Sequence, residues 1–172
     1  MRSLLEVLSN SMSRRYLVSG KLENNGRELN VKEFGERVAY VNAMDAYPWL
    51  TVAQTLRLAS SFISPTTNAF KSTEMVEQLI ETLALSPYRN FLCGELGRTE
   101  KQRLKLAIEI LKDTDVLLTD NVTKDMDLYD MAFVIDYVRD WAIKLSRTAV
   151  MAIQPPTLEI LTMFRKGNDN NK

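Results

Sequence analysis

Val116-Leu117-Leu118-Thr119-Asp120 is a continuous apolar run that ends in an acid, and Thr148-Ala149-Val150-Met151-Ala152-Ile153 is a second such run. Runs of this kind are typical of buried strands in a parallel sheet, covered on both faces. Between them lies a long stretch with the apolar spacing of an amphipathic helix (Met131, Val134, Ile135, Val138, Ala142 and Leu145). Strand, long helix and strand together predict an α/β domain with ligand sites at the carboxyl ends of its strands.

Segments outside this unit carry further local signals. Arg37 to Val41 predicts a strand, and the apolar spacing from Thr51 to Phe62 predicts a helix. Another helix is predicted to begin at the cap residue Ser72, and a third after Thr99, because Thr99-x-x-Gln102 has the spacing of a capping box. Asn25-Gly26 is a strong signal for a hairpin or a loop.

Composition limits the functions that the chain can have. The 172 residues fit one domain, and 22 basic against 22 acidic residues leave no net charge. Nucleic acid is therefore not an expected partner. Histidine is absent and Cys93 is the single cysteine, which excludes Ser-His-Asp and Cys-His catalysis and any internal disulfide. No apolar run approaches the roughly 18 residues of a transmembrane helix, so we expect a cytoplasmic chain.

Four longer segments carry motif-like patterns in a fixed order: Tyr40 to Leu56 (YVNAMDAYPWLTVAQTL), Leu96 to Arg103 (LGRTEKQR), Val116 to Asp127 (VLLTDNVTKDMD) and Ile153 to Phe164 (IQPPTLEILTMF). They resemble YVxQxD…PxLTVxETL, LSGGE+KR, LLLDEPTSGLD and IHQPxxEIFxLF of one family. That family is the nucleotide-binding domains of ATP-binding-cassette (ABC) transporters of the G, or white/sterolin, type. Gly20 to Leu29 resembles a fifth motif, GxIxxNGxxL. One short motif is weak evidence, but five in order are far more specific.

The resemblance runs from Leu4 to Phe164 and implies a fold. This fold is a partial P-loop NTPase (ABC ATPase) sandwich with a mainly parallel sheet and an inserted helical subdomain at about 51–111. It divides the chain into a nucleotide-binding domain, 1–164, and a polar tail, 165–172. The Walker A loop, G-x-x-x-x-G-K-[ST], occurs nowhere in the sequence. By analogy, the strand before that loop would lie beside the 148–153 strand, which we expect to have an unpaired edge.

The resemblance also implies roles for residues at the strand ends. Asp120 matches the Walker B aspartate, which holds Mg²⁺, although an acid after a strand is also a common turn cap. Asn121 stands at the position of the catalytic glutamate and Gln154 at that of the switch histidine. An amide has no titratable proton acceptor near neutral pH, so Asn121 cannot act as a general base. Gln154 keeps hydrogen-bonding capacity towards a γ-phosphate, or is only a polar residue after a strand.

Further positions match the parts of the family's site that contact nucleotide. Ala43 stands at the Q-loop position without hydrogen-bonding capacity, and Asp127 falls in the D-loop or in a solvated turn. The signature motif LSGGE corresponds to Leu96 to Glu100 and so includes Gly97, Arg98, Thr99 and Glu100. Gly97 lacks the hydroxyl of the family's serine. Arg98 and Thr99 carry side chains where the family has glycines. Arg98 is expected to be a solvated arginine beside the capping box, although arginine is able to bind phosphate.

The resemblance implies ATP and Mg²⁺ as cofactors, yet these departures predict weak binding and no ATP hydrolysis by the chain alone. The implied partner is an ABC half-transporter for lipid or sterol, or its transmembrane domain, at the cytoplasmic face of a membrane. Two alternatives stay open. The chain is a non-catalytic protein-interaction module, or it is a fragment of a full half-transporter gene.

Overall fold

The computed structural model describes residues 2–9, 11, 19–24, 26–30, 34–41, 46–62, 69–154, 157, 158, 160 and 162. Ala43, at the expected Q-loop position, lies outside the described residues, as does the tail 165–172. Six residues of the motif-like segment from Ile153 to Phe164 also lie outside them, namely 155, 156, 159, 161, 163 and 164.

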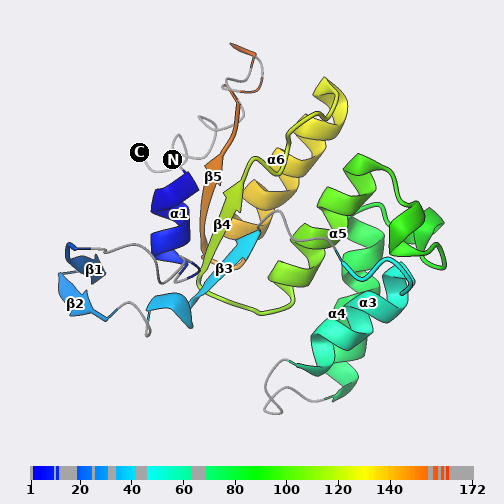
Figure 1. Cartoon of the computed structure of the whole chain (residues 1–172), viewed down its shortest axis with the longest axis horizontal. Helices are drawn as coiled ribbons and strands as arrows, with labels where there is room; N and C mark the ends of the chain where they lie inside the picture. The colour runs from blue at the N-terminus through cyan, green and yellow to red at the C-terminus, as the bar shows by residue number, and fades with distance from the viewer. Residues whose placement is uncertain are drawn as a thin grey trace.

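A three-stranded parallel sheet forms the centre of the molecule (Figure 1). Its strands are β3 (Val38–Val41), β4 (Val116–Asp120) and β5 (Thr148–Ala152), in the order β3-β4-β5. Val38 is level with Val116 and Val116 with Thr148, so the carboxyl ends of the strands lie at one edge. The helix α6 (Leu128–Lys144) connects β4 to β5. The parallel strand–helix–strand unit predicted from the sequence is confirmed.

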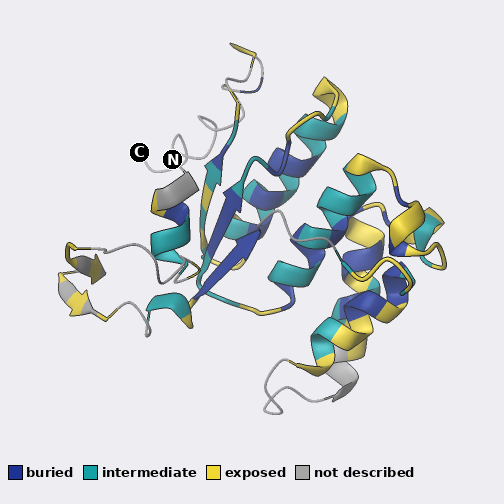
Figure 2. Cartoon of the chain, in the orientation of Figure 1, coloured by how far each residue is buried: buried dark blue, intermediate teal, exposed yellow. Residues whose placement is uncertain are grey.

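Both faces of β3 and β4 are covered, which explains the continuous apolar run in β4. Ala39, Val41 and Leu117 belong to the larger core, which also contains Val134 and Val138 of α6. The alternate residues Val38, Tyr40 and Leu118 pack on the opposite face with Leu5 of α1 (Arg2–Leu8). Because successive side chains of a strand point to opposite faces, a strand between two layers needs apolar residues at every position. In Figure 2, β3 and β4 are accordingly almost wholly buried.

The strand β5 departs from the prediction of a buried strand. It lies at the edge of the sheet, and Val150 in its middle is 43% exposed. Among the described residues no strand pairs with its outer side. An unpaired edge was expected here, and the exposure of β5 follows from it, because an edge strand has a neighbour on one side only.

The helices between β3 and β4 form a separate group beside the sheet, as Figure 1 shows. They are α3 (Val52–Ser61), α4 (Ala69–Thr82), the short 3₁₀ turns η1 (Ser86–Tyr88) and η2 (Cys93–Glu95), and α5 (Arg98–Ile110). Thr51 caps α3 through a reciprocal capping box with Gln54. The helix α3 packs against α4 and α5, and α5 in turn packs on β3. This arrangement agrees with the inserted helical subdomain.

Two predicted helix starts were wrong. Ser72 lies inside α4, which begins three residues earlier at Ala69, so Ser72 is not its cap. The helix α5 begins at Arg98 with Gly97 as its N-cap, and Thr99 lies in its first turn. Capping patterns locate a helix start within a few residues, because Ser and Thr also occur within the first turns.

The hairpin signal was correct. β1 (Leu22–Asn24) and β2 (Arg27–Leu29) pair in antiparallel fashion across residues 25 and 26. Gly26 has a φ of 77°, a left-handed conformation that glycine adopts without steric cost. Two-residue hairpin loops require such conformations, which is why the Asn-Gly pair predicts them.

Candidate functional site

The structure brings Asp120, Asn121 and Gln154 to the same edge of the sheet. Asp120 is the last residue of β4 and is level with Ala152 of β5. The Asn121 backbone N–H donates to the Ala152 carbonyl oxygen over 2.8 Å, which ties the two strand ends together. Gln154 follows two residues after Ala152 and is exposed. The carboxyl ends of parallel strands are the usual place of ligand sites in α/β folds.

The backbone at Asn121 is left-handed, and its side chain is fixed against Asp120. Its φ is 53°, a region that asparagine tolerates better than most residues. The Asn121 Nδ2 donates to Asp120 Oδ1 over 3.1 Å. The side chain after the strand is therefore a hydrogen-bond donor to the carboxylate, not a second carboxylate. It has no titratable proton acceptor with which to activate a water molecule.

The described residues at this edge offer Mg²⁺ one carboxylate, that of Asp120, which is the lower end of what proteins supply. Magnesium prefers oxygen ligands in octahedral geometry, and proteins usually supply one or two carboxylates besides the phosphates of a substrate. Asp120 contributes one half-buried carboxylate, and one of its oxygens accepts from the Asn121 amide. Within the described part of the chain, no group of three or more Asp, Glu, Cys or His side chains is placed to hold a metal.

The signature-like segment starts α5 without a side-chain cap. Gly97, the N-cap, is extended with φ −65° and ψ 172°, and as a glycine it has no side chain that could cap the helix. A Cβ built on Gly97 would collide with the Glu100 carboxylate, so the Glu100 side chain folds back over this residue. Thr99 and Glu100 are half-buried in the first turn of the helix. The space beside Gly97 is thus taken by a carboxylate, which disfavours an anion there.

Arg98 is exposed to solvent, as predicted, and it also forms an ion pair that the sequence did not predict. Its Nη1 lies 2.5 Å from Asp125 Oδ2, so it joins the start of α5 to the turn after β4. One turn further along α5, Arg103 Nη2 lies 2.5 Å from Asp130 Oδ1. The Arg103 guanidinium also stands 4.6 Å from the centre of the Phe133 ring. Neither the pairing of Arg98 with Asp125 nor that of Arg103 with Asp130 could be predicted, because partners 27 residues apart carry no local signal.

Asp127 has a structural role in the described geometry. It is the N-cap of α6, and its Oδ1 accepts from the Asp130 backbone N–H over 2.8 Å. An aspartate at this place satisfies one of the free N–H groups of the helix start and interacts favourably with the helix dipole. The helix α6 consequently begins at Leu128, three residues before the first apolar position that predicted it.

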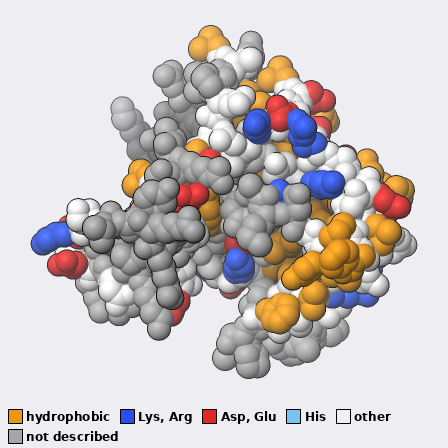
Figure 3. All heavy atoms as spheres, in the orientation of Figure 1, with side chains coloured by type: hydrophobic (Ala, Val, Ile, Leu, Met, Phe, Trp, Pro, Cys, Tyr) orange, Lys and Arg blue, Asp and Glu red, His pale blue; other side chains and the backbone are white. Residues whose placement is uncertain are grey.

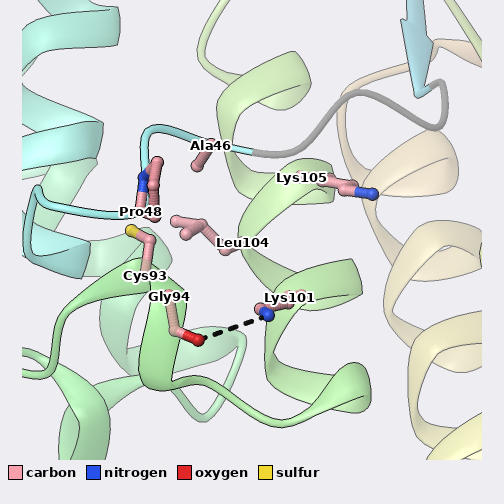
Figure 4. Close-up of a pocket in the computed structure, with 7 residues that line it drawn as sticks. All are labelled: Ala46, Pro48, Cys93, Gly94, Lys101, Leu104 and Lys105. Carbon is pink, nitrogen blue, oxygen red and sulfur yellow. Dashed lines mark hydrogen bonds between the residues drawn. The ribbon is translucent and has the colours of Figure 1, made fainter.

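A small cavity of about 170 Å³ lies beside the signature-like segment (Figure 4). Its walls are Ala46 and Pro48 from the segment before α3, Cys93 and Gly94 from η2, and Lys101, Leu104 and Lys105 from α5. The Lys101 Nζ lies 3.5 Å from the Gly94 carbonyl oxygen across its mouth. The cavity is below the range of about 300–1,000 Å³ that small-molecule sites occupy.

A surface of aromatic and aliphatic side chains lies near this cavity, and we define this aromatic surface as Tyr47, Trp49, Phe91 and Leu92. Trp49 is 69% exposed and Tyr47 61%, and their ring centres are 5.7 Å apart. The Val52 N–H donates to the Phe91 carbonyl oxygen, and Thr51 forms an isolated antiparallel β-bridge with Leu92. These backbone contacts hold the start of α3 against the segment that contains Phe91 and Leu92. Figure 3 shows hydrophobic side chains gathered over α3 and the segment leading into it.

Comparison with known proteins identifies relatives of this chain. Residues 3–124 match the family model described as ABC transporter. The chain is 27% identical over 172 residues to ABC transporter G family member 5 of Dictyostelium discoideum, covering 94% of this chain and 11% of that protein. It is 29% identical over 149 residues to ABC transporter G family member STR2 of Medicago truncatula, covering 83% of this chain and 20% of that protein.

Another relative and a solved structure agree with these matches. ABC transporter G family member 4 of Arabidopsis thaliana is 26% identical over 164 residues, covering 94% of this chain and 28% of that protein. The chain thus spans between about a tenth and about a quarter of the length of these curated relatives. A dimeric ATP-binding cassette in a post-hydrolysis state with ADP and phosphate shares the fold, with a TM-score of 0.74. At 13% identity it covers 92% of this chain and 71% of that one.

Proposed function

Because this chain belongs to the ABC transporter family and is related to the G family members, we propose that its ATP site is degenerate and does not hydrolyse ATP alone. The proposal depends above all on Asn121. It stands where the resemblance places the catalytic glutamate, and its amide donates to the Asp120 carboxylate. Removal of a general base commonly lowers the rate of a reaction by about 10²–10⁴-fold.

Other positions of the proposed site support the same proposal. The 172 residues contain no G-x-x-x-x-G-K-[ST], the loop whose backbone N–H groups and lysine hold phosphates. Arg98 is paired with Asp125, and the Glu100 carboxylate covers Gly97, where the family places a signature serine. Each missing donor to a developing charge commonly lowers kcat by about 10²–10³-fold. Gln154 lies exposed beyond β5, and its amide can form hydrogen bonds but has no titratable proton.

In this proposal the chain acts as a structural partner of a transporter. We infer that 51–111 is the helical subdomain and that the partner is an ABC half-transporter, or its transmembrane domain, for a lipid or sterol. It would act at the cytoplasmic face of a membrane. The described helices are too short or too polar for any of them to cross a bilayer.

A calorimetric titration with Mg·ATP tests the proposed defect in nucleotide binding. We expect no saturable heat at millimolar nucleotide from the wild-type chain, because Asp120 alone offers a single carboxylate. Saturable binding that is lost in Asp120→Asn and kept in the remote control Asp113→Asn would contradict this part of the proposal. Cooperative unfolding followed by circular dichroism establishes that each protein used in the titration is folded.

The aromatic surface favours a second candidate function, that of a non-catalytic interaction module. Exposed Trp and Tyr side chains are enriched where proteins bind one another. Here Tyr47 and Trp49 are in contact with each other and both are largely exposed, so burying them against a partner would remove a large apolar area from water. The surface is compatible with docking onto a half-transporter and does not require ATP.

A binding assay with a detergent-solubilised G family half-transporter tests this second candidate. We expect Trp49→Ser to weaken binding by tenfold or more, as is common for a buried anchor residue, on the order of 2 kcal/mol. Phe62→Ser is the matched control, because Phe62 is also exposed but lies at the opposite end of α3. Equal loss in both variants, or none in either, would reject the aromatic surface as the docking site.

A further inference from the structure

A second, larger cavity of about 460 Å³ lies between α4 and α6. We call it the α4–α6 cavity. Met75 and Leu79 of α4 and Ile110 of α5 line its apolar side. Its volume is within the range of about 300–1,000 Å³ of small-molecule sites, which are mostly apolar with a few polar groups. Neither the family motifs nor the proposed function accounts for a cavity here.

The wall formed by α6 carries three aromatic rings in line. Phe133, Tyr137 and Trp141 are spaced four residues apart, so they lie along one face of the helix. Aromatic faces attract cations, and Phe133 already has the Arg103 guanidinium 4.6 Å from its centre. The Tyr137 hydroxyl hydrogen-bonds to Thr82, which also lines the cavity, and burial raises the pKa of Tyr137, so this hydroxyl is neutral. Tyr137 and Trp141 thus offer uncharged ring faces.

The charged residues that line this cavity are mainly acidic. Asp113, Asp136 and Asp140 contribute three carboxylates, against the single ammonium of Lys144. Arg139 pairs with Asp136 and Asp140, and Arg147 pairs with Asp113, but neither guanidinium lines the cavity. Lys144 and Arg139 hold the pKa of Asp140 below its usual value, so it is ionised at neutral pH. A ligand in the cavity therefore faces aromatic rings, the Lys144 ammonium, and three carboxylates that each pair with a cationic side chain.

We propose that the α4–α6 cavity binds a small organic cation, an ammonium group attached to an apolar body. The apolar body would pack against Met75, Leu79 and Ile110. Its ammonium would lie near the rings of Tyr137 and Trp141 and the carboxylates of Asp136 and Asp140. A neutral molecule of the same shape lacks the cation–π and ionic attractions, and an anion is repelled by the same carboxylates. This site is independent of nucleotide, so it stands or falls apart from the proposed function.

Three probes that share an apolar phenylalkyl chain and differ in their terminal polar group test the proposal: 4-phenylbutylamine, 4-phenylbutanol and 4-phenylbutyrate. Calorimetry and ligand-observed NMR with the whole chain are expected to rank them amine, alcohol, carboxylate. We expect about a tenfold preference for the amine over the alcohol, the size that a partly desolvated cation–π contact provides. Equal binding of amine and alcohol, or no binding of the amine at millimolar concentration, would overturn the proposal.

Variants locate the binding and separate it from unfolding. Gln78 lines the cavity and is exposed, so Gln78→Trp is expected to fill it and abolish amine binding while the melting temperature stays unchanged. Glu81→Trp is the matched control on the same helix, since Glu81 is exposed but does not line the cavity. Tyr137→Leu is expected to weaken amine binding about tenfold, whereas Tyr137→Phe, which keeps the ring, preserves it. Amine binding unchanged by Gln78→Trp would place it elsewhere and refute the site.

Discussion

Single side chains decide what the strand ends can do. Asn121 matches the local backbone well, because asparagine tolerates the left-handed conformation with φ 53°. The same residue donates its side-chain amide to Asp120, and in the proposed site this donor stands where the family has a carboxylate. That an amide follows Asp120 is known from the sequence alone. The hydrogen bond to Asp120 required the structure.

Thr119 offers a test at the residue scale. It lies in β4, it is fully buried, and within the described part of the chain its hydroxyl has no hydrogen-bond partner. Because a buried hydroxyl without a partner is costly, Thr119→Val is expected to raise the free energy of unfolding by about 1 kcal/mol. Urea denaturation measures this. The control is Thr55→Val, which removes the contact of Thr55 Oγ1 with Cys93 Sγ at 3.2 Å and should not stabilise the chain.

Gly97 provides a second test at this scale. Its extended backbone, with φ −65°, suits any residue, and Glu100 stands at the third helical position. Gly97→Ser would create the Ser-x-x-Glu pattern of a capping box, and we expect stability to rise by a few tenths of a kcal/mol. Glu100 must rotate away from the new Cβ for this to happen. A melting temperature that falls would show that Glu100 is not free to move.

At the scale of elements, one carboxylate joins the amino ends of the three parallel strands. Asp115, just before β4, accepts from Arg37 Nε over 2.7 Å and also pairs with Arg147, just before β5. Arg147 Nη2 further donates to Asp113 over 3.1 Å. These groups are partly exposed, so their contribution is modest and sensitive to salt.

Removal of this carboxylate should loosen the sheet. Asp115→Asn is expected to lower the free energy of unfolding by about 1 kcal/mol at low ionic strength, because two arginines lose their shared partner. Denaturation at low and at high salt measures the effect, which should shrink as salt screens the pairs. Asp113→Asn, with one arginine partner, should cost less. An effect of equal size at both salt concentrations would show that the role of Asp115 is not ionic.

The helical group has its own ion pairs, with a predictable response to pH. Hydrogen bonds from Arg89, with further attraction from Arg89 and Arg57, lower the pKa of Glu77 below its usual 4.5. A carboxylate with a lowered pKa stabilises the fold above pH 4.5 and loses this contribution as pH falls through its folded pKa. Glu77→Gln should therefore be less stable than wild type at pH 7, and the two should converge in acid. A constant gap across this range would mean that ionisation of Glu77 is irrelevant.

Element types were easier to predict than element ends. β4, α6 and the hairpin followed from apolar periodicity and from Asn25-Gly26, signals that are local in the chain. The starts of α4 and α5 were missed, because Ser72 and Thr99 resemble caps but lie within helices. The apolar run of β5 predicted a buried strand, whereas β5 is partly exposed. Burial depends on what lies beside a strand and not only on its own residues.

At the scale of the whole molecule, the order of motifs carried more information than any one of them. It led to the ABC fold, which the match over residues 3–124 and the shared fold at a TM-score of 0.74 support. The α4–α6 cavity and the ion pairs of Arg98 and Arg103 could not be predicted from the sequence. They join residues distant in the chain, and only the packing of α5 and α6 brings them together.

The central claim is that these 172 residues do not form a working ATPase, and steady-state release of phosphate from Mg·ATP tests it most directly. Wild type and Asp120→Asn are to be assayed side by side at the same protein concentration and saturating nucleotide. We predict release at the background rate of buffer from both proteins, because the proposed site has no general base and the sequence contains no G-x-x-x-x-G-K-[ST]. Steady release by wild type that disappears in Asp120→Asn would contradict the account.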